Sequence, residues 1–450
     1  MICSVLLKID SRLPVCRHAV VESPERRMVS QNNGKKRVVV TGIGVVSPNG
    51  IGVDQFTRNL RAGISGIDYI HSFDTSALQV RFAAHLERFD VNSVMDPRDL
   101  RRVGRLVPLA LAACREAMAM AGLAIDPAAI EESQQTGVLL GTGGGGLGFI
   151  EPQYKAYFTG EGKYSPFTVP AGTHGNISSE LSIALGLRGF SHVVSNGCAS
   201  STDAIGYAAM HIQRGDIPMI LVGGADAPIT EGILKGFELM RILASPTEPV
   251  TQSSRPFSLN RNGFVLGEGA WFFLLEDADH AAARGAKVLA EIRGWGSTCD
   301  AYHRVAPAPD GAQCARAISL AMQEAGIGPE DVDYVNLHGT GTQLNDTLET
   351  AAIHMALGPR AGEIPASATK SMIGHPQGAC GAAGVAATIL SLRAGFIHPT
   401  INLMEPDPQC DLNYVPHAAA DSRGAQWAIC NCIAFGSKNS ALAVRVEPEK

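Results

Sequence analysis

The chain has 450 residues, of which 45% are hydrophobic and 18% charged, so it contains enough apolar material for a large folded core. Its formal net charge is −6, and its 37 Lys and Arg residues are scattered rather than clustered. This distribution excludes the broad basic surface that nucleic-acid binding requires, so we expect no nucleic-acid partner.

The predicted elements alternate between strands and helices along the chain. Strands are expected at 37–46, 136–140, 192–195, 218–224, 288–296, 332–336, 426–434 and 440–446. Helices are expected at 98–122, 199–213, 310–325, 346–357 and 379–394. This alternation predicts an α/β protein with a mainly parallel sheet and helices on both faces.

Two series of elements each open with a strand that ends in Gly-x-Gly, namely Gly42-Ile-Gly44 and Gly294-Trp-Gly296. The repeat suggests two related halves, which we place at 36–286 and 287–450. The segment at about 50–135 is then a helical insertion in the first half. Residues 1–35 are predicted to be a poorly ordered N-terminal tail.

The ten cysteines are widely spaced, and no Cys or His cluster has the spacing of a zinc site. We therefore predict no metal. The apolar start of the chain stops at Lys8, far short of a signal-peptide core or a membrane span. Reduced thiols, no membrane span and a cytoplasmic location are the resulting expectations.

Cys198 lies in the segment Ser195-Asn-Gly-Cys198-Ala-Ser, between a predicted strand and a predicted helix. A tight turn at a helix N-terminus is therefore expected there. The helix dipole and the free amide groups of such a turn favour a thiolate and can hold a developing oxyanion. A small buried cysteine that only packs is the alternative, and this context alone leaves both open.

Two histidines lie at similar junctions. His338 follows a strand, and the next helix is expected to have Asp346 as its N-cap and Glu349 at N3. His375 precedes a helix rich in small residues and lies five residues after Lys370. Each histidine alone could be structural. One cysteine and two histidines at three strand–helix junctions together indicate an active site.

The glycine run 141–146 formally fits the GxGxxG pattern of dinucleotide-binding loops. However, no acidic residue ends a second strand at the usual distance, and Pro152 interrupts the following segment. We therefore interpret the run as a site of close backbone packing, and we predict no cofactor.

Four segments, in this order, resemble the elongating type II β-ketoacyl-acyl carrier protein synthases of the thiolase superfamily. They are Asn196–Cys198, Asn336–Thr342, Thr369–His375 and Asn431–Asn439, and the likeness extends from about Arg37 to Val446. The resemblance implies a five-layered αβαβα fold from two duplicated halves. It also implies a homodimeric acyltransferase (condensing enzyme) that acts on acyl carrier protein in fatty acid biosynthesis.

The resemblance also implies a role for each matching residue. Cys198 would carry the acyl chain, and His338 and His375 would stabilise the enolate formed as malonyl loses carbon dioxide. Backbone N–H groups of Cys198 and Phe435 would form the oxyanion hole. The remaining roles are organisation of the histidines (Lys370, Glu349), pantetheine contact (Thr340, Thr342), phosphate contact (Arg241) and carrier docking (Arg98, Arg101, Arg102). For the last three, a solvated basic helix start is the alternative.

The chain departs from the family pattern in two places, and the first leaves loop motion and chain-length selection open. The gate usually reads Phe-Gly-Phe-Gly-Gly-Thr-Asn, whereas here it comprises Ile433, Ala434, Phe435 and Gly436, followed by Ser437. Replacing two glycines removes backbone freedom. The usual acidic residue after Arg-Pro-aromatic is also absent, since Ser258 stands there.

Three other functions remain as alternatives. One is a ketosynthase of a type II polyketide or polyene pathway. Another is a non-catalytic partner resembling a chain-length factor, although such partners typically lack the cysteine present here as Cys198. A thiolase, with Cys432 as second cysteine, is disfavoured by the His338-Gly-Thr-Gly-Thr segment.

Overall fold

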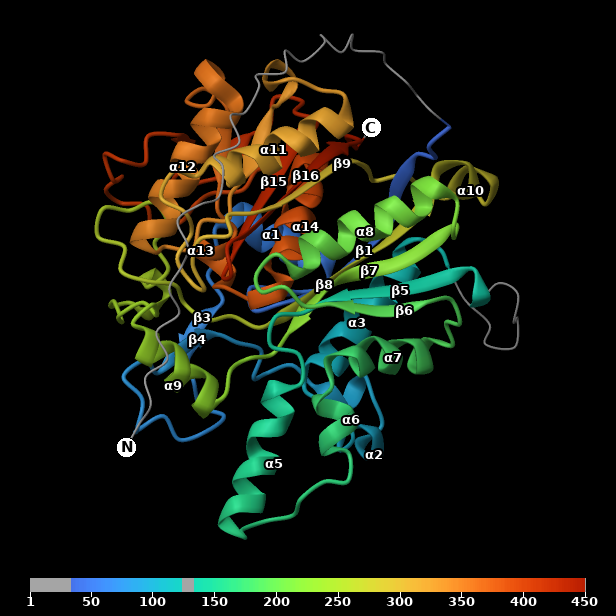
Figure 1. The fold of residues 1–450 in the computed structure, drawn as a ribbon, viewed down its shortest axis with the longest axis vertical. Helices are drawn as coiled ribbons and strands as arrows, with labels where there is room; N and C mark the ends of the chain where they lie inside the picture. Colours follow the sequence, from blue (N-terminus) through green and yellow to red (C-terminus); the bar gives the residue numbers. More distant parts are fainter. Residues whose placement is uncertain (1–33, 124–132, 450) are drawn as a thin grey trace, which may run out of the picture. The chain divides into compact units, whose positions relative to one another are not determined.

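The computed structural model describes residues 34–123 and 133–449, and Figure 1 shows its elements. The predicted tail, residues 1–35, lies almost wholly outside the described residues. The strands are β1 (Val38–Ser47), β2 (Gly50–Ile51), β3 (Ile67–Tyr69), β4 (Phe82–Ala84), β5 (Thr136–Gly141), β6 (Ser191–Val194), β7 (Met219–Asp226), β8 (Gly269–Asp277), β9 (Ala290–Cys299), β10 (Tyr334–Asn336), β11 (Pro365–Ser367), β12 (Phe396–Ile397), β13 (Asn413–Tyr414), β14 (Ala420–Asp421), β15 (Trp427–Ala434) and β16 (Lys438–Val446). The helices are α1 (Val53–Ala62), α2 (Pro97–Leu100), α3 (Leu106–Met120), α5 (Leu147–Thr159), α6 (Thr168–Gly172), α7 (His174–Leu185), α8 (Ser200–Arg214), α9 (Glu231–Met240), α10 (Ala278–Ala283), α11 (Ala312–Ala325), α12 (Gln343–Leu357), α13 (Lys370–Ile373) and α14 (Cys380–Arg393).

The main sheet repeats one pairing pattern in its two halves. Its order is β13-β11-β10-β15-β16-β9-β1-β8-β7-β5-β6, and the halves meet where β9 pairs with β1. In the first half, β6, β5 and β7 are parallel, and β8 and β1 follow in antiparallel pairing. In the second half, β11, β10 and β15 are parallel, and β16 and β9 follow in the same way.

The prediction of a mainly parallel sheet is wrong for the centre of each half. Strands β8 and β16 run antiparallel to both of their neighbours. For β16 the reason is local, because only residues 435–437 separate it from β15, and so short a connection can join only antiparallel strands. The strand expected at 440–446 is present as β16, whereas β8 was not among the expected strands.

The two halves of the main sheet form two of five layers, and helices form the other three (Figure 1). Helices α8 and α14 pack against each other and against strands of both halves, so they form the central layer. Helices α3 and α7 cover the outer face of the first half. Helix α11, with α12 beside it, covers the outer face of the second half. The protein therefore has the αβαβα architecture of the thiolase-like fold.

The two Gly-x-Gly segments make equivalent contacts in the two halves. A Cβ atom on Gly42 in β1 would lie 1.9 Å from the carbonyl oxygen of Ala117 in α3. A Cβ atom on Gly294 in β9 would lie 2.0 Å from the carbonyl oxygen of Ala321 in α11. Bare backbone at these positions is what allows each outer helix to lie directly on its strand. Each outer helix is thus held against its strand by the same kind of close backbone contact.

Most predicted helices and strands are present within a few residues of their expected bounds. The main exception is the helix expected at 98–122, which is broken into α2 and α3 with Gly104 between them. Asp96 caps α2 by accepting a hydrogen bond from the Arg98 N–H, so the short helix has its own start. In the described part of the chain, no helix is long and apolar enough to cross a membrane.

Candidate active site

The three strand–helix junctions singled out in the sequence converge on one point. Cys198 lies just before α8, His338 just after β10, and His375 between α13 and α14. The Cys198 Sγ and one ring nitrogen of each histidine lie within 4.8 Å of one another, and all three residues are buried. They lie at one cavity of about 370 Å³. The structure thus brings together the three residues that the sequence analysis singled out.

Cys198 occupies a tight turn that a glycine makes possible. Gly197 adopts φ 75°, and a Cβ atom there would lie 3.4 Å from the Ala434 Cβ and 3.5 Å from the Phe435 oxygen. The turn before α8 and the segment after β15 therefore approach each other closely. The expected position of Cys198, beside the start of a helix, is found in the structure.

His375 is the partner of the thiol. Its Nε2 lies 3.1 Å from the Cys198 Sγ. Burial lowers the pKa of His375, but the negative charge of Cys198 and the hydrogen bond to it raise the pKa more strongly, to about 9. The arrangement therefore favours an imidazolium whose Nε2–H is directed at the Cys198 sulfur. The Nδ1 atom has no hydrogen-bond partner among the described residues.

His338 has the opposite electrostatic environment. Burial, and next the ammonium group of Lys370, lower the pKa of His338 to about 3, so its imidazole is neutral. The Lys370 Nζ lies 3.3 Å from His338 Nδ1 and donates to the His338 carbonyl oxygen at 2.6 Å. Because an ammonium can only donate, Nδ1 accepts and the ring proton lies on Nε2. His338 is thus a neutral donor.

Glu349 holds the backbone of His338 from the other side. Its carboxylate accepts from the N–H groups of His338 at 2.6 Å and Gly339 at 2.8 Å, and from the Asn431 amide at 2.6 Å. Burial raises the pKa of Glu349 to about 7, although these hydrogen bonds oppose the shift. Lys370 and Glu349 therefore both position His338, by contacts with different atoms of that residue.

The expected capping of the following helix is wrong. Helix α12 begins at Gln343, and Thr342 is its N-cap, with its hydroxyl accepting from the Asn345 N–H. Asp346 and Glu349 therefore lie inside the helix. Both carboxylates face the loop before it rather than the helix end, because that loop contains several backbone N–H groups with no partner in a strand.

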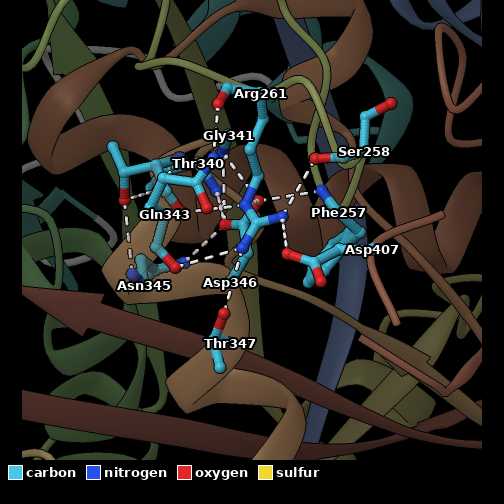
Figure 2. A network of polar contacts seen from close by, with 12 residues as sticks. Phe257, Ser258, Arg261, Thr340, Gly341, Gln343, Asn345, Asp346, Thr347 and Asp407 are labelled. Carbon is cyan, nitrogen blue, oxygen red and sulfur yellow. Dashed lines mark hydrogen bonds and ion pairs between the residues drawn. The ribbon is translucent and has the colours of Figure 1, made fainter. Parts of the chain in front are cut away.

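Asp346 belongs to a buried polar network that the sequence analysis missed (Figure 2). Its carboxylate accepts from the N–H groups of Thr340, Gly341 and Phe257. The guanidinium of Arg261, whose side chain is fully buried, lies 3.5 Å from Asp346 and 2.6 Å from Asp407. This network fixes the loop that follows His338. The sequence did contain a signal for this network, because Arg261 is the one charged residue in the segment 256–267.

The predicted gate forms one wall of the cavity. Ile433, Ala434 and Phe435 line it, and the Gly436 N–H donates to the Arg304 oxygen at 2.9 Å. Ser437 adopts φ 65° although it is not a glycine, and its hydroxyl donates to the His303 oxygen at 2.8 Å.

The residues predicted to contact pantetheine and its phosphate line the cavity, whereas those predicted to contact the carrier do not. Thr340, Thr342 and Arg241 line the cavity, and the two threonine hydroxyls are 3.0 Å apart. The predicted carrier-docking residues Arg98, Arg101 and Arg102 are exposed in and just after α2 and do not line this cavity.

The glycine run after β5 is held by a buried acid. The Asp226 carboxylate accepts from the N–H groups of Gly143 at 2.8 Å, Gly144 at 2.9 Å and Gly378 at 2.8 Å. A Cβ atom on Gly143 would lie 2.9 Å from the Gly378 nitrogen. The interpretation as close backbone packing is confirmed.

Two family models match the chain, the beta-ketoacyl synthase N-terminal domain over residues 35–281 and the C-terminal domain over residues 289–404. A 3-oxoacyl-[acyl-carrier-protein] synthase 2 of Staphylococcus aureus (strain COL) is 39% identical over 418 residues, which are 93% of this chain and 99% of that protein. A protein of the same name from Synechocystis sp. is 39% identical over 92% of this chain and 99% of its own length.

Two solved structures share the fold closely. A beta-ketoacyl synthase from Burkholderia phymatum STM815 superposes with a TM-score of 0.84 at 32% identity. The ishigamide ketosynthase/chain length factor superposes with a TM-score of 0.83, also at 32% identity. Each comparison covers 92% of this chain and 100% of the other chain.

Proposed function

The chain belongs to the beta-ketoacyl synthase family, and from this premise we propose that it condenses an acyl chain held on Cys198 with malonyl-acyl carrier protein. The observation that carries the proposal is the convergence of one thiol and two imidazoles at one cavity. The opposite pKa shifts of the two histidines give each a separate task.

In the first step, the Cys198 thiolate attacks the thioester of an acyl carrier. The contact from His375 Nε2 holds the sulfur ready for attack. The sulfur–carbon bond to pantetheine breaks as the bond to Cys198 forms, and the departing thiolate takes a proton from solvent, so His375 keeps its Nε2 proton for the second step. Backbone N–H groups of Cys198 and Phe435 would stabilise the oxyanion, which the close approach of Phe435 to Gly197 supports.

In the second step, the malonyl thioester binds with its carbonyl oxygen between the two histidines. Carbon dioxide leaves, and the electron pair moves into an enolate whose oxygen accepts from His338 Nε2 and His375 Nε2. A neutral His338, with Lys370 bound at Nδ1, presents this donor without gaining or losing a proton. The enolate carbon then attacks the acyl group and releases the Cys198 thiolate.

The cavity provides a path for the pantetheine arm. Thr340 and Thr342 lie on one wall, where their hydroxyls can meet its amides, and Arg241 lies where it can pair with the phosphate. Because the loop of both threonines is held by Asp346, this wall is preorganised.

Fatty acid synthesis is the pathway that we propose, because the relatives named above act in 3-oxoacyl-[acyl-carrier-protein] synthesis. Polyketide or polyene assembly is the second candidate. The likeness to the ishigamide ketosynthase/chain length factor and the substituted gate at Ala434 and Ser437 favour it.

We also propose a homodimer. Strand β6 is an open edge of the main sheet, and the nearby helices expose Phe158, Val169 and Ile183 at 79%, 73% and 75%.

Arg98, Arg101 and Arg102 are the proposed contacts to an acidic carrier, since all three are exposed. A division into halves at 36–286 and 287–450 and a cytoplasmic location complete the proposal.

Intact-protein mass spectrometry tests the first step. The full chain is incubated with acyl carrier proteins that bear acyl groups of different length. We expect a mass gain of one acyl group in the wild type and none in Cys198→Ala, and the preferred length reports the specificity. An undiminished gain in Cys198→Ala would contradict the assigned nucleophile, and Cys430→Ala serves as the matched control.

A further inference from the structure

Two further thiols lie behind the nucleophile, and the proposed reaction uses neither. Cys380 begins α14 and Cys432 lies in β15, and both are buried. Their sulfur atoms are 3.7 Å apart, and each thiol donates to the carbonyl oxygen of Cys198, at 3.3 Å and 3.1 Å. The Cys432 Sγ also lies 3.5 Å from His338 Nδ1. Segments far apart in the sequence thus bring two sulfurs and one imidazole nitrogen together.

Two of these distances match the edges of a zinc coordination tetrahedron. With Zn–S bonds of about 2.3 Å and a Zn–N bond of about 2.1 Å, the sulfur–sulfur edge is about 3.8 Å and the sulfur–nitrogen edge about 3.6 Å. The corresponding separations here are 3.7 Å and 3.5 Å. One donor atom from each of Cys380, Cys432 and His338 lies within 4.8 Å of the other two. Two of the three edges therefore already have the length that an ion requires, and the third, from the Cys380 sulfur to a His338 ring nitrogen, is at most 4.8 Å.

We propose that Cys380, Cys432 and His338 form a binding site for a thiolate-preferring divalent cation, with Zn²⁺ as its natural test ion. Binding forms two Zn–S bonds and one Zn–N bond, and the two thiols each release a proton to solvent, so no oxidant or reductant takes part. The Cys198 carbonyl oxygen, which both thiols already face, is the available fourth donor.

Lys370 is the charged group that opposes this site. Its Nζ lies 3.3 Å from the same His338 nitrogen that would bind the ion. One lone pair cannot serve both, so a bound cation displaces the lysine from Nδ1. Zinc binding and the lysine–histidine contact are therefore mutually exclusive, and Lys370→Met is expected to strengthen binding.

A second triad, Cys198, His338 and His375, also brings its donor atoms within 4.8 Å of one another. There the Cys198 sulfur is already hydrogen-bonded to His375 Nε2, and the group faces the cavity. The rear site is favoured because it offers two sulfurs rather than one and because its sulfur–sulfur and Cys432–His338 separations fit the ion. Replacement of Cys198 separates the two sites, because only the second triad needs that sulfur.

Zinc titration of the full, metal-stripped and reduced chain against a chromophoric chelator tests the proposal without any acyl substrate. We expect one equivalent to bind, with affinity at least about tenfold weaker in Cys380→Ala and Cys432→Ala. Cobalt substitution should give a thiolate-to-metal charge-transfer band that the same variants lose. Cys430→Ala, a buried cysteine two positions along β15, is the matched control and should bind as the wild type does.

Three outcomes would overturn the proposal. The first is that the wild type binds no stoichiometric zinc. The second is that Cys380→Ala and Cys432→Ala both bind zinc as tightly as the wild type. The third is that Cys198→Ala loses zinc binding while Cys380→Ala retains it, which would place the ion in the second triad. Thermal unfolding verifies that each variant is folded, and Cys380→Ser replaces any alanine variant that is not. Because acylation of Cys198 is measured separately, failure here leaves the condensation mechanism unaffected.

Discussion

The loop after β5 and the loop after β10 occupy equivalent positions in the two halves, yet only one carries a reactive side chain. The second residue after the strand is Gly143 in the first loop and His338 in the second. In both loops this residue and the next donate their N–H groups to one buried carboxylate, Asp226 or Glu349. The same backbone support is therefore used once for packing alone and once to present an imidazole.

Replacing His338 by Gly converts the second loop into the form of the first. We expect the condensation rate to fall by about 10²–10³-fold, because one donor to the enolate oxygen is lost. Formation of the Cys198 acyl adduct should persist. Condensation within tenfold of the wild-type rate, measured with malonyl-acyl carrier protein, would show that the two loops do not differ in the way described.

The two carboxylates are expected to contribute similarly to stability and differently to activity. Asp226→Asn and Glu349→Gln each place an amide where a carboxylate accepted backbone N–H groups, which should cost about 1–3 kcal/mol in the free energy of unfolding. Urea unfolding measures this. Only Glu349→Gln should also markedly slow condensation, because it displaces His338. An equal loss of activity in both variants would contradict the distinction.

The pseudo-equivalent glycines provide a stability test of the two halves. Gly42→Ala and Gly294→Ala should each destabilise the protein by about 1–3 kcal/mol, because the added methyl group meets a helix carbonyl oxygen in both halves. Thermal unfolding of the two variants should give similar shifts. A large effect in one half and none in the other would argue against equivalent packing.

The buried histidine makes stability depend on pH. The pKa of His338 is about 3 in the folded chain and 6.5 as its ordinary value, so below pH 6.5 the unfolded chain binds a proton that the folded chain does not. Stability should therefore fall as pH drops from 6.5 towards 3, by up to about 1.4 kcal/mol per pH unit from this group.

His338→Gln removes this titration, so the variant should lose less stability than the wild type over the same range of pH. Urea unfolding between pH 7 and pH 4, with its range limited to where both proteins stay folded, makes the comparison. Identical pH profiles would show that His338 is not buried in its neutral form. His398, whose pKa burial lowers to about 4, supplies a background common to both proteins.

Local sequence signals were sufficient for much of this account. The turn at Cys198, the strand end before His338 and the Gly-x-Gly pairs depend on residues close together in the sequence. The antiparallel strands β8 and β16 and the start of α12 depend on pairing and on the hydrogen-bond needs of a loop, which a periodicity does not encode. The meeting of Cys380 with Cys432 arises only when the central helix packs on β15.

In the proposed mechanism, Cys198 carries the acyl group and His338 serves the condensation, so the two tasks can be separated. Single-turnover condensation tests it most directly, with enzyme first acylated on Cys198 and then mixed with malonyl-acyl carrier protein. We expect the wild type to release carbon dioxide and the extended acyl product. His338→Ala should retain its acyl group and release neither. Normal turnover of the acylated His338→Ala enzyme would contradict the account.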